Sequence, residues 1–322
     1  MRRILVTGAS GFVGGYLLPV LQRDFPEAEL HATAHGAMTP SDEVRWHRLD
    51  LLEAEAVQAL IGSLRPDVVI HLAAQSNVAL SFREPELTWR VNLEGTLHLQ
   101  RALASQGRCL LIQVGSADMY GASFLDGVVD EQSLLQPLNP YAASKAAADL
   151  AAFELSRTSE VQVIRARPFN HTGAGQSDAF VVSGFARQIA ETEAGLREPV
   201  ITTGDLSAER DFLHVADVAE AYTALIQKGA GLESGSAVNI CSGEAVAVST
   251  VLDELISLSS VPLERRVDPE KLRKSDIPRV QGRAALLQSE TGWARRISRR
   301  QMLSSVLDYW RGVYGAKPEK RG

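Results

Sequence analysis

Short apolar runs alternate with stretches of helix length through the first half of the 322-residue chain. The runs are rich in Ile, Val and Leu, which is typical of strands buried on both faces of a parallel sheet. Strands that alternate with helices imply right-handed crossovers and a doubly wound α/β fold. The predicted strands are residues 3–6, 29–33, 67–72, 109–114 and 161–165, and the predicted helices are residues 12–23, 53–64, 87–105 and 141–157.

Composition excludes several classes of protein. The formal net charge is −6, which argues against a general nucleic-acid or membrane binder. No window approaches the roughly 18 consecutive apolar residues of a spanning helix, so we expect a cytoplasmic protein. Cys109 and Cys241 lie in apolar runs and are expected in the core, not in a disulfide. His171 has no second ligand at suitable spacing, so no metal site is expected.

The first predicted strand runs directly into TGASGFVG and then into a helix. A sharp turn and a close approach of backbone to phosphate both need residues without a Cβ. The helix amino terminus offers N–H groups and a positive dipole end to a pyrophosphate. A glycine-rich structural turn is the alternative, but the position of this segment directly after the first strand favours a dinucleotide site. The predicted cofactor-binding residues here are Gly8, Ser10, Gly11, Phe12, Val13 and Gly14.

The end of the second strand bears on the choice of cofactor. A site specific for NAD usually places an acidic residue there to bind the ribose 2′-OH. Ala34 and His35 occupy that position, so NADP(H) is mildly favoured, with NAD(H) possible, and His35 is a candidate contact for a 2′-phosphate. Asp50 either binds the adenine amino group or caps a helix. The further residues predicted to line the cofactor are Leu51, Leu72 and Pro168.

The segment Asn139–Lys145, NPYAASK, carries the strongest catalytic signal. Asn139 is a good helix cap and the following proline a good first helical residue, so Tyr141 and Lys145 lie one turn apart on one face. A neighbouring ammonium favours the phenolate and makes proton exchange feasible. An ordinary surface pair is the alternative. Ser116 follows the fourth strand, at the same edge of the sheet as the glycine loop, which favours a catalytic set of Ser116, Tyr141 and Lys145.

These pieces together resemble the extended short-chain dehydrogenase/reductase family over nearly the whole chain. The matching motifs are TGASGFVG, HLAAQSNV, VNLEGT, RPFNHTG and RDFLHVADV. The resemblance implies that Ser116 and Tyr141 bind the reacting oxygen, that Tyr141 transfers the proton and that Lys145 holds the nicotinamide ribose. It implies cofactor contacts for Ala73, Ala74, Asn92 and His171. It also implies a homodimer through helices 87–105 and 141–157.

Within that family, HLAAQSNVALSF, ARPFNHTGAGQ, GDLSAERDFLHVADV and LRKSDIPRVQG resemble enzymes that act on GDP-mannose derivatives. A 4,6-dehydratase needs a carboxylate base, and members of that kind carry Glu two positions after the active-site hydroxyl. Asp118 stands there instead, one methylene shorter. This favours NAD(P)H-dependent reduction of the C4 ketone of a nucleotide-linked 4-keto-6-deoxyhexose. A 4,6-dehydratase and a 4-epimerase remain alternatives, and a non-catalytic dinucleotide sensor is less favoured because Tyr141 and Lys145 are both present.

The sequence divides into a dinucleotide-binding domain and a smaller lobe. We predict a Rossmann-type domain from residues 1–170 and about 211–241, and a discontinuous α/β substrate-binding lobe from about 171–210 and 242–315, with a frayed tail at 316–322. The substrate pocket is expected between them. Its nucleotide-sugar diphosphate suits arginine forks, for which surface solvation is the alternative. The candidate substrate-binding residues are Gln75, Ser76, Ser116, Asp118, Asn170, Arg187, Arg210 and Arg273.

Overall fold

A parallel sheet forms the centre of the larger domain in the computed structural model, which describes residues 2–36, 38, 42–269 and 277–315. Within these residues the sheet has seven strands in the order β10-β6-β5-β4-β1-β2-β3, and every neighbouring pair is parallel. The strands are β1 (Arg3–Thr7), β2 (Glu29–Ala34), β3 (Val44–Arg48), β4 (Val68–His71), β5 (Leu110–Val114), β6 (Gln162–Pro168) and β10 (Ser236–Ile240).

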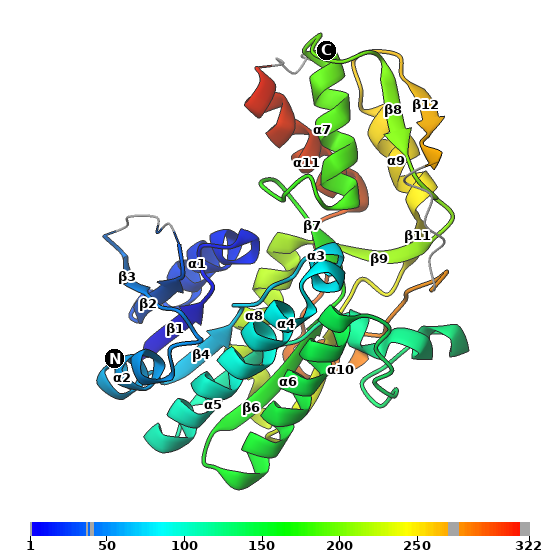
Figure 1. Ribbon diagram of the computed structural model, residues 1–322. Helices are drawn as coiled ribbons and strands as arrows, with labels where there is room; N and C mark the ends of the chain where they lie inside the picture. The colour runs from blue at the N-terminus through cyan, green and yellow to red at the C-terminus, as the bar shows by residue number, and fades with distance from the viewer. Residues whose placement is uncertain (1, 37, 39–41, 270–276, 316–322) are drawn as a thin grey trace.

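Helices cover both faces of this sheet, as Figure 1 shows. One face packs against α1 (Phe12–Asp24), α8 (Val215–Lys228) and α10 (Ala285–Thr291), whose apolar residues share one core cluster with the strands. The other packs against α2 (Ala54–Leu64), α5 (Gly95–Gln106) and α6 (Pro140–Thr158), which share a second cluster. The predicted doubly wound, Rossmann-type fold is therefore confirmed.

Two elements differ from the sequence prediction. Strand β3 was not predicted, because at the edge of the sheet only Val44 of its five residues is buried and no continuous apolar run marks it. The predicted helix 87–105 is divided into α4 (Pro85–Trp89), a π-helical turn at Arg90–Glu94 and α5. The π turn contains the buried residue Asn92, which bonds to the loop after β4.

A second lobe lies beyond the carboxyl edge of the large sheet, at the top of Figure 1. Its core cluster lies among α7 (Val181–Glu193), α9 (Val248–Ser257) and α11 (Arg299–Tyr314). A small sheet of β7 (Asn170–Thr172), β9 (Glu209–His214) and β11 (Ala245–Ala247) runs beneath it, and β8 (Val200–Thr203) pairs with β12 (Glu264–Val267). Short helical segments α3 (Val78–Arg83), η2 (Ala117–Asp126) and η3 (Gly229–Gly231) complete the described elements.

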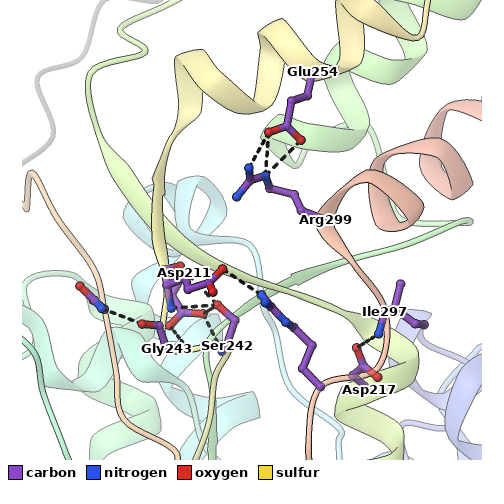
Figure 2. A network of polar contacts seen from close by, with 10 residues as sticks. Asp211, Asp217, Ser242, Gly243, Glu254, Ile297 and Arg299 are labelled. Atoms are coloured by element: carbon purple, nitrogen blue, oxygen red, sulfur yellow. Dashed lines mark hydrogen bonds and ion pairs between the residues drawn. The ribbon is translucent and has the colours of Figure 1, made fainter.

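Two buried carboxylates accept hydrogen bonds at the points where the chain passes between the larger domain and the second lobe, as Figure 2 shows. Asp211, in β9, is fully buried and accepts hydrogen bonds from the Ser242 N–H at 2.8 Å, the Ser242 hydroxyl at 2.6 Å and the Gly243 N–H at 2.9 Å. Asp217, in the first turn of α8, accepts from the Ile297 N–H at 3.1 Å. Both parts therefore share one hydrogen-bonded framework.

Among the described residues, no helix combines the length and the apolar character that crossing a bilayer requires.

Candidate active site

A cavity of about 800 Å³ opens at the carboxyl edge of the large sheet. The loops that follow β1, β2, β3, β4 and β5 line it, and α6, β7 and the start of α7 contribute further wall. Most of the predicted site residues meet here. Those in the lining are Gly8, Ser10, Gly11, Phe12, Val13, Gly14, His35, Asp50, Leu51, Leu72, Ala73, Ala74, Gln75, Ser76, Ser116, Asp118, Tyr141, Lys145, Pro168, Asn170 and His171.

The glycine loop after β1 forms a cradle that side chains would fill. Gly8 has φ +68°, and a Cβ there would lie 2.6 Å from the Ala73 Cα. A Cβ on Gly14 would lie 2.1 Å from the Ala9 carbonyl oxygen, so α1 can sit this close to the loop only with glycine. The Gly11 N–H closes the turn onto the Gly8 carbonyl at 3.0 Å. The cap residue of α1 is Gly11, which has no side chain to bond the first N–H groups of the helix, so the residues present fit a pyrophosphate.

The opposite end of the cavity is lined by His35 and Asp50. Asp50 accepts a hydrogen bond from the Leu52 N–H at 2.9 Å, while Glu53 occupies the cap position of α2. Asp50 is therefore free of the helix-cap role that the sequence left open. The His35 side chain is 80% exposed, with its Nε2 3.5 Å from the Asp50 carboxylate. The residue that follows β2 is thus an exposed imidazole and not a carboxylate, which is compatible with a 2′-phosphate, and the Asp50 carboxylate beside it comes from the loop after β3.

Helix α6 begins as the sequence predicts. The Asn139 side chain accepts a hydrogen bond from the Ala142 N–H at 2.8 Å, and Pro140 is the first helical residue. This start places Tyr141 near the end of β5, where its side chain and that of Ser116 line the same cavity. One turn further on, the buried Lys145 ammonium donates to the carbonyl of Val114.

Burial and neighbouring charge set the proton affinities of these groups. Burial raises the pKa of Tyr141, the Asp118 carboxylate raises that pKa further, and the nearby Ser116 side chain lowers it. Tyr141 therefore holds its proton at neutral pH. Burial lowers the pKa of Lys145 to about 8, against the opposing effect of Asp149. The site thus presents a protonated phenol beside a lysine that titrates near physiological pH.

Asp118 joins this group from the same loop as Ser116. Its backbone N–H donates to the Ser116 hydroxyl at 3.2 Å. Burial raises the pKa of Asp118, and the Arg210 guanidinium lowers it. Arg210 is outside the cavity lining, but its charge acts on a carboxylate that is part of that lining.

Gln75 and His171 are held by their own loops. The Gln75 amide donates to the Thr88 hydroxyl at 2.9 Å, and its side-chain oxygen accepts from the Asn77 N–H. His171 is bonded through Nδ1 to the Phe169 carbonyl at 2.9 Å, and its ring stacks on Phe12 with centroids 6.4 Å apart. Burial lowers the pKa of His171, so the imidazole is neutral. Within the described residues, no group of three or more His, Cys, Asp or Glu side chains could hold a metal ion.

Three other predicted residues are not in the lining. Asn92 lies behind the wall, 1% exposed, because its side chain holds the backbone of the loop after β4. Arg187 faces Asp178 and Glu191, with which it forms ion pairs. Arg273 lies outside the described residues.

The cavity also includes residues that sequence reasoning missed. Phe180, 40% exposed, caps α7 at the side of the second lobe, and Tyr222 approaches from α8. Neither belongs to a recognisable motif. The only signal was the position of Phe180 just after a glycine-rich turn. The remaining unpredicted lining residues are Thr33, Gly36, Leu49, Leu52, Val78, Leu87, Val91, Val114, Gly115, Ala117, Phe169 and Gln176.

The fold and this site together define an extended short-chain dehydrogenase/reductase. The glycine cradle after β1, the serine after β5 and the Tyr141/Lys145 pair on α6 open onto one cavity, as that class requires.

Comparisons with known proteins narrow the class. A family model described as GDP-mannose 4,6 dehydratase matches residues 5–306. The chain is 38% identical to GDP-6-deoxy-D-mannose reductase of Pseudomonas aeruginosa, covering 96% of this chain and 97% of that protein. The solved structure of RMD from Pseudomonas aeruginosa complexed with NADPH has 37% identity and a TM-score of 0.83, covering 97% of this chain and 100% of the other. The UDP-glucose 4-epimerase of Thermus thermophilus in complex with NAD has 27% identity and a TM-score of 0.84, covering 97% and 99%. The chain therefore belongs to the GDP-mannose 4,6-dehydratase family of extended short-chain dehydrogenases/reductases.

Proposed function

We propose that this protein is an oxidoreductase that uses NAD(P)H to reduce the C4 ketone of a nucleotide-linked 4-keto-6-deoxyhexose. The favoured substrate is GDP-4-keto-6-deoxy-D-mannose, and the product is GDP-D-rhamnose. The observation that carries the proposal is the Tyr141 hydroxyl, which lines the same cavity as Ser116 and holds its proton at neutral pH. A ketone reductase needs such a proton donor at the reacting oxygen. The relative that is a GDP-6-deoxy-D-mannose reductase supports the choice of substrate.

The side chains divide the work of this reaction. The nicotinamide cofactor, when bound, supplies the hydride that reduces C4. The Ser116 hydroxyl would hold the C4 oxygen in place, and Tyr141 would donate the proton that converts this oxygen into a hydroxyl. The Lys145 ammonium would bind the ribose and stabilise the phenolate that Tyr141 leaves behind.

NADP(H) is the cofactor we favour, with NAD(H) possible. The glycine cradle would take the pyrophosphate on Gly8, Ser10, Gly11, Phe12, Val13 and Gly14. His35 would meet a 2′-phosphate and Asp50 the adenine. Leu51, Leu72, Ala73, Ala74, Pro168 and His171 would complete the cofactor site, with Asn92 supporting it from behind. The RMD structure with NADPH supports this preference.

The substrate would extend toward the second lobe. Gln75, Ser76, Asp118 and Asn170 are in the cavity wall at that side and would contact the sugar. Arg210 would serve the diphosphate, as would Arg273, while the ion pairs of Arg187 count against a direct contact. A GDP-hexose is the class of substrate proposed.

The proposal extends to the organisation of the protein. We assign residues 1–170 and about 211–241 to dinucleotide binding, because β10 joins the large sheet, and about 171–210 and 242–315 to substrate binding. Helix α10 is an exception within the second range, because it packs on the large sheet. A homodimer through α4, α5 and α6 is supported by exposed apolar side chains such as Trp89, Leu150 and Phe153. The proposed location is the cytoplasm.

Cofactor stoichiometry tests the proposed reaction. Incubation with GDP-4-keto-6-deoxy-D-mannose should consume one NAD(P)H for each sugar reduced. The consumption is measured as the loss of absorbance at 340 nm. Turnover of GDP-mannose without added reductant would instead support a 4,6-dehydratase. That alternative rests on Asp118, a carboxylate beside Ser116 whose raised pKa makes it able to accept a proton. A 4-epimerase would interconvert two sugars with no net change in cofactor.

Replacement of Tyr141 by Phe tests the catalytic assignment. The variant should lose turnover by a factor of at least about 100, because general acid catalysis contributes that much or more. Its dissociation constant for NADPH should stay near that of the unsubstituted chain. Normal activity of this variant would contradict the role given to Tyr141.

A further inference from the structure

A chain of buried side chains runs beneath the glycine cradle. Thr7, His71 and Thr96 are 0%, 1% and 2% exposed. The Thr7 hydroxyl lies 2.7 Å from His71 Nδ1, and His71 Nε2 lies 2.9 Å from the Thr96 hydroxyl. The three residues come from the end of β1, the end of β4 and the first turn of α5. One imidazole therefore connects the glycine loop to the helix on the other side of β4.

The direction of every hydrogen bond in this chain follows from its last member. The Thr96 hydroxyl donates to the Asn92 carbonyl at 2.7 Å, so its oxygen can only accept from His71. His71 must then carry its proton on Nε2, and its Nδ1 accepts from Thr7. The Thr7 oxygen is left to accept from the Ala73 N–H, at 3.5 Å. The hydrogen bonds therefore all run in one direction, from the Ala73 N–H through Thr7, His71 and Thr96 to the Asn92 carbonyl.

This arrangement requires an imidazole with a single proton. A second proton on His71 would turn Nδ1 into a donor and break its bond with Thr7. Burial and the nearby Lys145 ammonium lower the pKa of His71 to about 3, so the ring stays neutral across the physiological range. The chain is therefore permanent in the folded protein.

Both ends of the chain meet parts of the cofactor cavity. At one end, Ala73 is the backbone against which Gly8 is pressed, and both residues are in the lining. At the other end, the Asn92 side chain accepts from the Gln75 N–H at 2.7 Å and donates to the Gln75 carbonyl at 3.0 Å. The same amide donates to Ser144 at 3.0 Å.

Ser144 extends the chain to the catalytic helix. Its hydroxyl donates to the carbonyl of Tyr141 at 2.8 Å, within the first turn of α6. Thr7, His71, Thr96, Asn92 and Ser144 therefore form one connected set under the glycine loop, the loop after β4 and the start of α6.

We propose that His71 is a positioning residue of the cofactor site. Through its hydrogen bonds with Thr7 and Thr96, His71 holds the backbone at Ala73 against the glycine loop, so that the cradle is formed before the dinucleotide binds. The inference rests on the proposed function only in taking a dinucleotide as the ligand. A preformed cradle avoids ordering the two loops on binding, and this saving appears as affinity.

The test is the affinity of the full-length chain for NADPH, measured by isothermal titration calorimetry without any sugar. Thr7→Val keeps the shape of the buried side chain but removes the donor to His71. It should weaken NADPH binding about tenfold, because the two loops must then be ordered when the dinucleotide binds. Thr7→Ser keeps the hydroxyl and should bind within about twofold of the unsubstituted chain.

Tyr120→Phe is the matched control for lost stability. Tyr120 is fully buried, donates to Asn239 at 2.8 Å and accepts from Arg167 at 2.9 Å, but it is outside the cavity lining. Its variant should lower the Tm and leave the affinity for NADPH unchanged. If Thr7→Val behaves like Tyr120→Phe, or if Thr7→Ser weakens binding as much as Thr7→Val, the positioning role is wrong.

Two further results separate this inference from the proposed function. If Thr7→Val does not fold, Thr96→Val carries the same expectation, because it removes the acceptor of His71 Nε2. NADPH binding by the unsubstituted chain without ketone reduction would overturn the proposed reaction alone. Failure of the unsubstituted chain to bind either NADPH or NADH would overturn both.

Discussion

At the scale of single residues, the catalytic group combines charges that oppose one another. Burial and the Asp118 carboxylate raise the pKa of Tyr141, whereas Ser116, from the same loop as Asp118, lowers it. Burial raises the pKa of Asp118 in turn, and the charge of Arg210 lowers it. The result is a phenol that keeps its proton until a reaction demands it, which suits the delivery of a proton to a reduced carbonyl.

Lys145 gives this site a measurable pH dependence. Its folded-state pKa of about 8 lies below its ordinary value of 10.5, so the ammonium loses its proton as the pH rises through 8. The kcat/KM for ketone reduction should therefore fall above about pH 8, because the charge that stabilises the phenolate disappears. A pH–rate profile measured between pH 6 and pH 10 checks this. A profile that stays flat to pH 9.5 would contradict it.

Glycine substitutions in α1 separate the cradle from the rest of the helix. Gly14→Ala should abolish or strongly weaken dinucleotide binding, because its Cβ would lie 2.1 Å from the Ala9 carbonyl oxygen. Gly15→Ala is the matched control, since a Cβ there would meet no atom of the described residues within 4 Å. It should raise the free energy of unfolding by about 0.5–1 kcal/mol and leave binding intact. Calorimetric titration with NADPH and chemical unfolding distinguish the two; equal effects would refute the packing argument.

At the scale of elements, local chemistry determined what the sequence could predict. The glycine loop, the start of α6 and the serine after β5 were predictable because each depends on residues close together in the chain. Strand β3 was not predictable, because it lies at the edge of the sheet, where most of its side chains are not buried and need not be apolar. The π turn before α5 also escaped prediction, because the pairing of Asn92 with Gln75 and Ser144 exists only in three dimensions.

The cap of α6 offers a test at this scale. Asn139→Ala removes the side-chain acceptor for the Ala142 N–H and should lower the free energy of unfolding by about 1 kcal/mol. Asn139→Ser supplies another capping oxygen and should recover most of that loss. Urea unfolding followed by circular dichroism measures both variants. If the alanine and serine variants are equally stable, the cap contributes little to α6.

At the scale of the whole molecule, the sequence analysis missed some residues of the cavity and predicted one, Arg187, that the cavity lining does not include. Phe180 reaches the cavity from α7 in the second lobe and Tyr222 from α8 on a face of the large sheet, and no local pattern marks either of them. Arg187 shows the reverse case: it has the right chemistry for a diphosphate, but neighbouring carboxylates hold its side chain. Whether such residues reach the cavity depends on long-range packing, which the sequence does not reveal. The glycine cradle and the catalytic set can be predicted because local motifs specify them.

The proposed dimer is tested through α6. Leu150 and Phe153 are 58% and 39% exposed and lie three residues apart on this helix, so they are neighbours in one exposed apolar patch of the kind that marks a protein–protein contact. Leu150→Asp should convert the dimer to monomers in sedimentation experiments. Leu196→Asp, at a residue 67% exposed outside α4, α5 and α6, is the control and should leave the dimer unchanged. A chain that sediments as a monomer without any substitution would contradict the proposed homodimer.

The pairing of β10 with β6 has a consequence for biosynthesis. Residues 236–240 supply the last strand of the large sheet, yet about 70 residues separate them from β6 along the chain. Until the ribosome has released them, β6 is an open edge with unpaired N–H and carbonyl groups. A nascent chain or a truncated product that ends before residue 236 should therefore be prone to aggregate and depend on chaperones, however complete its glycine loop and catalytic helix are.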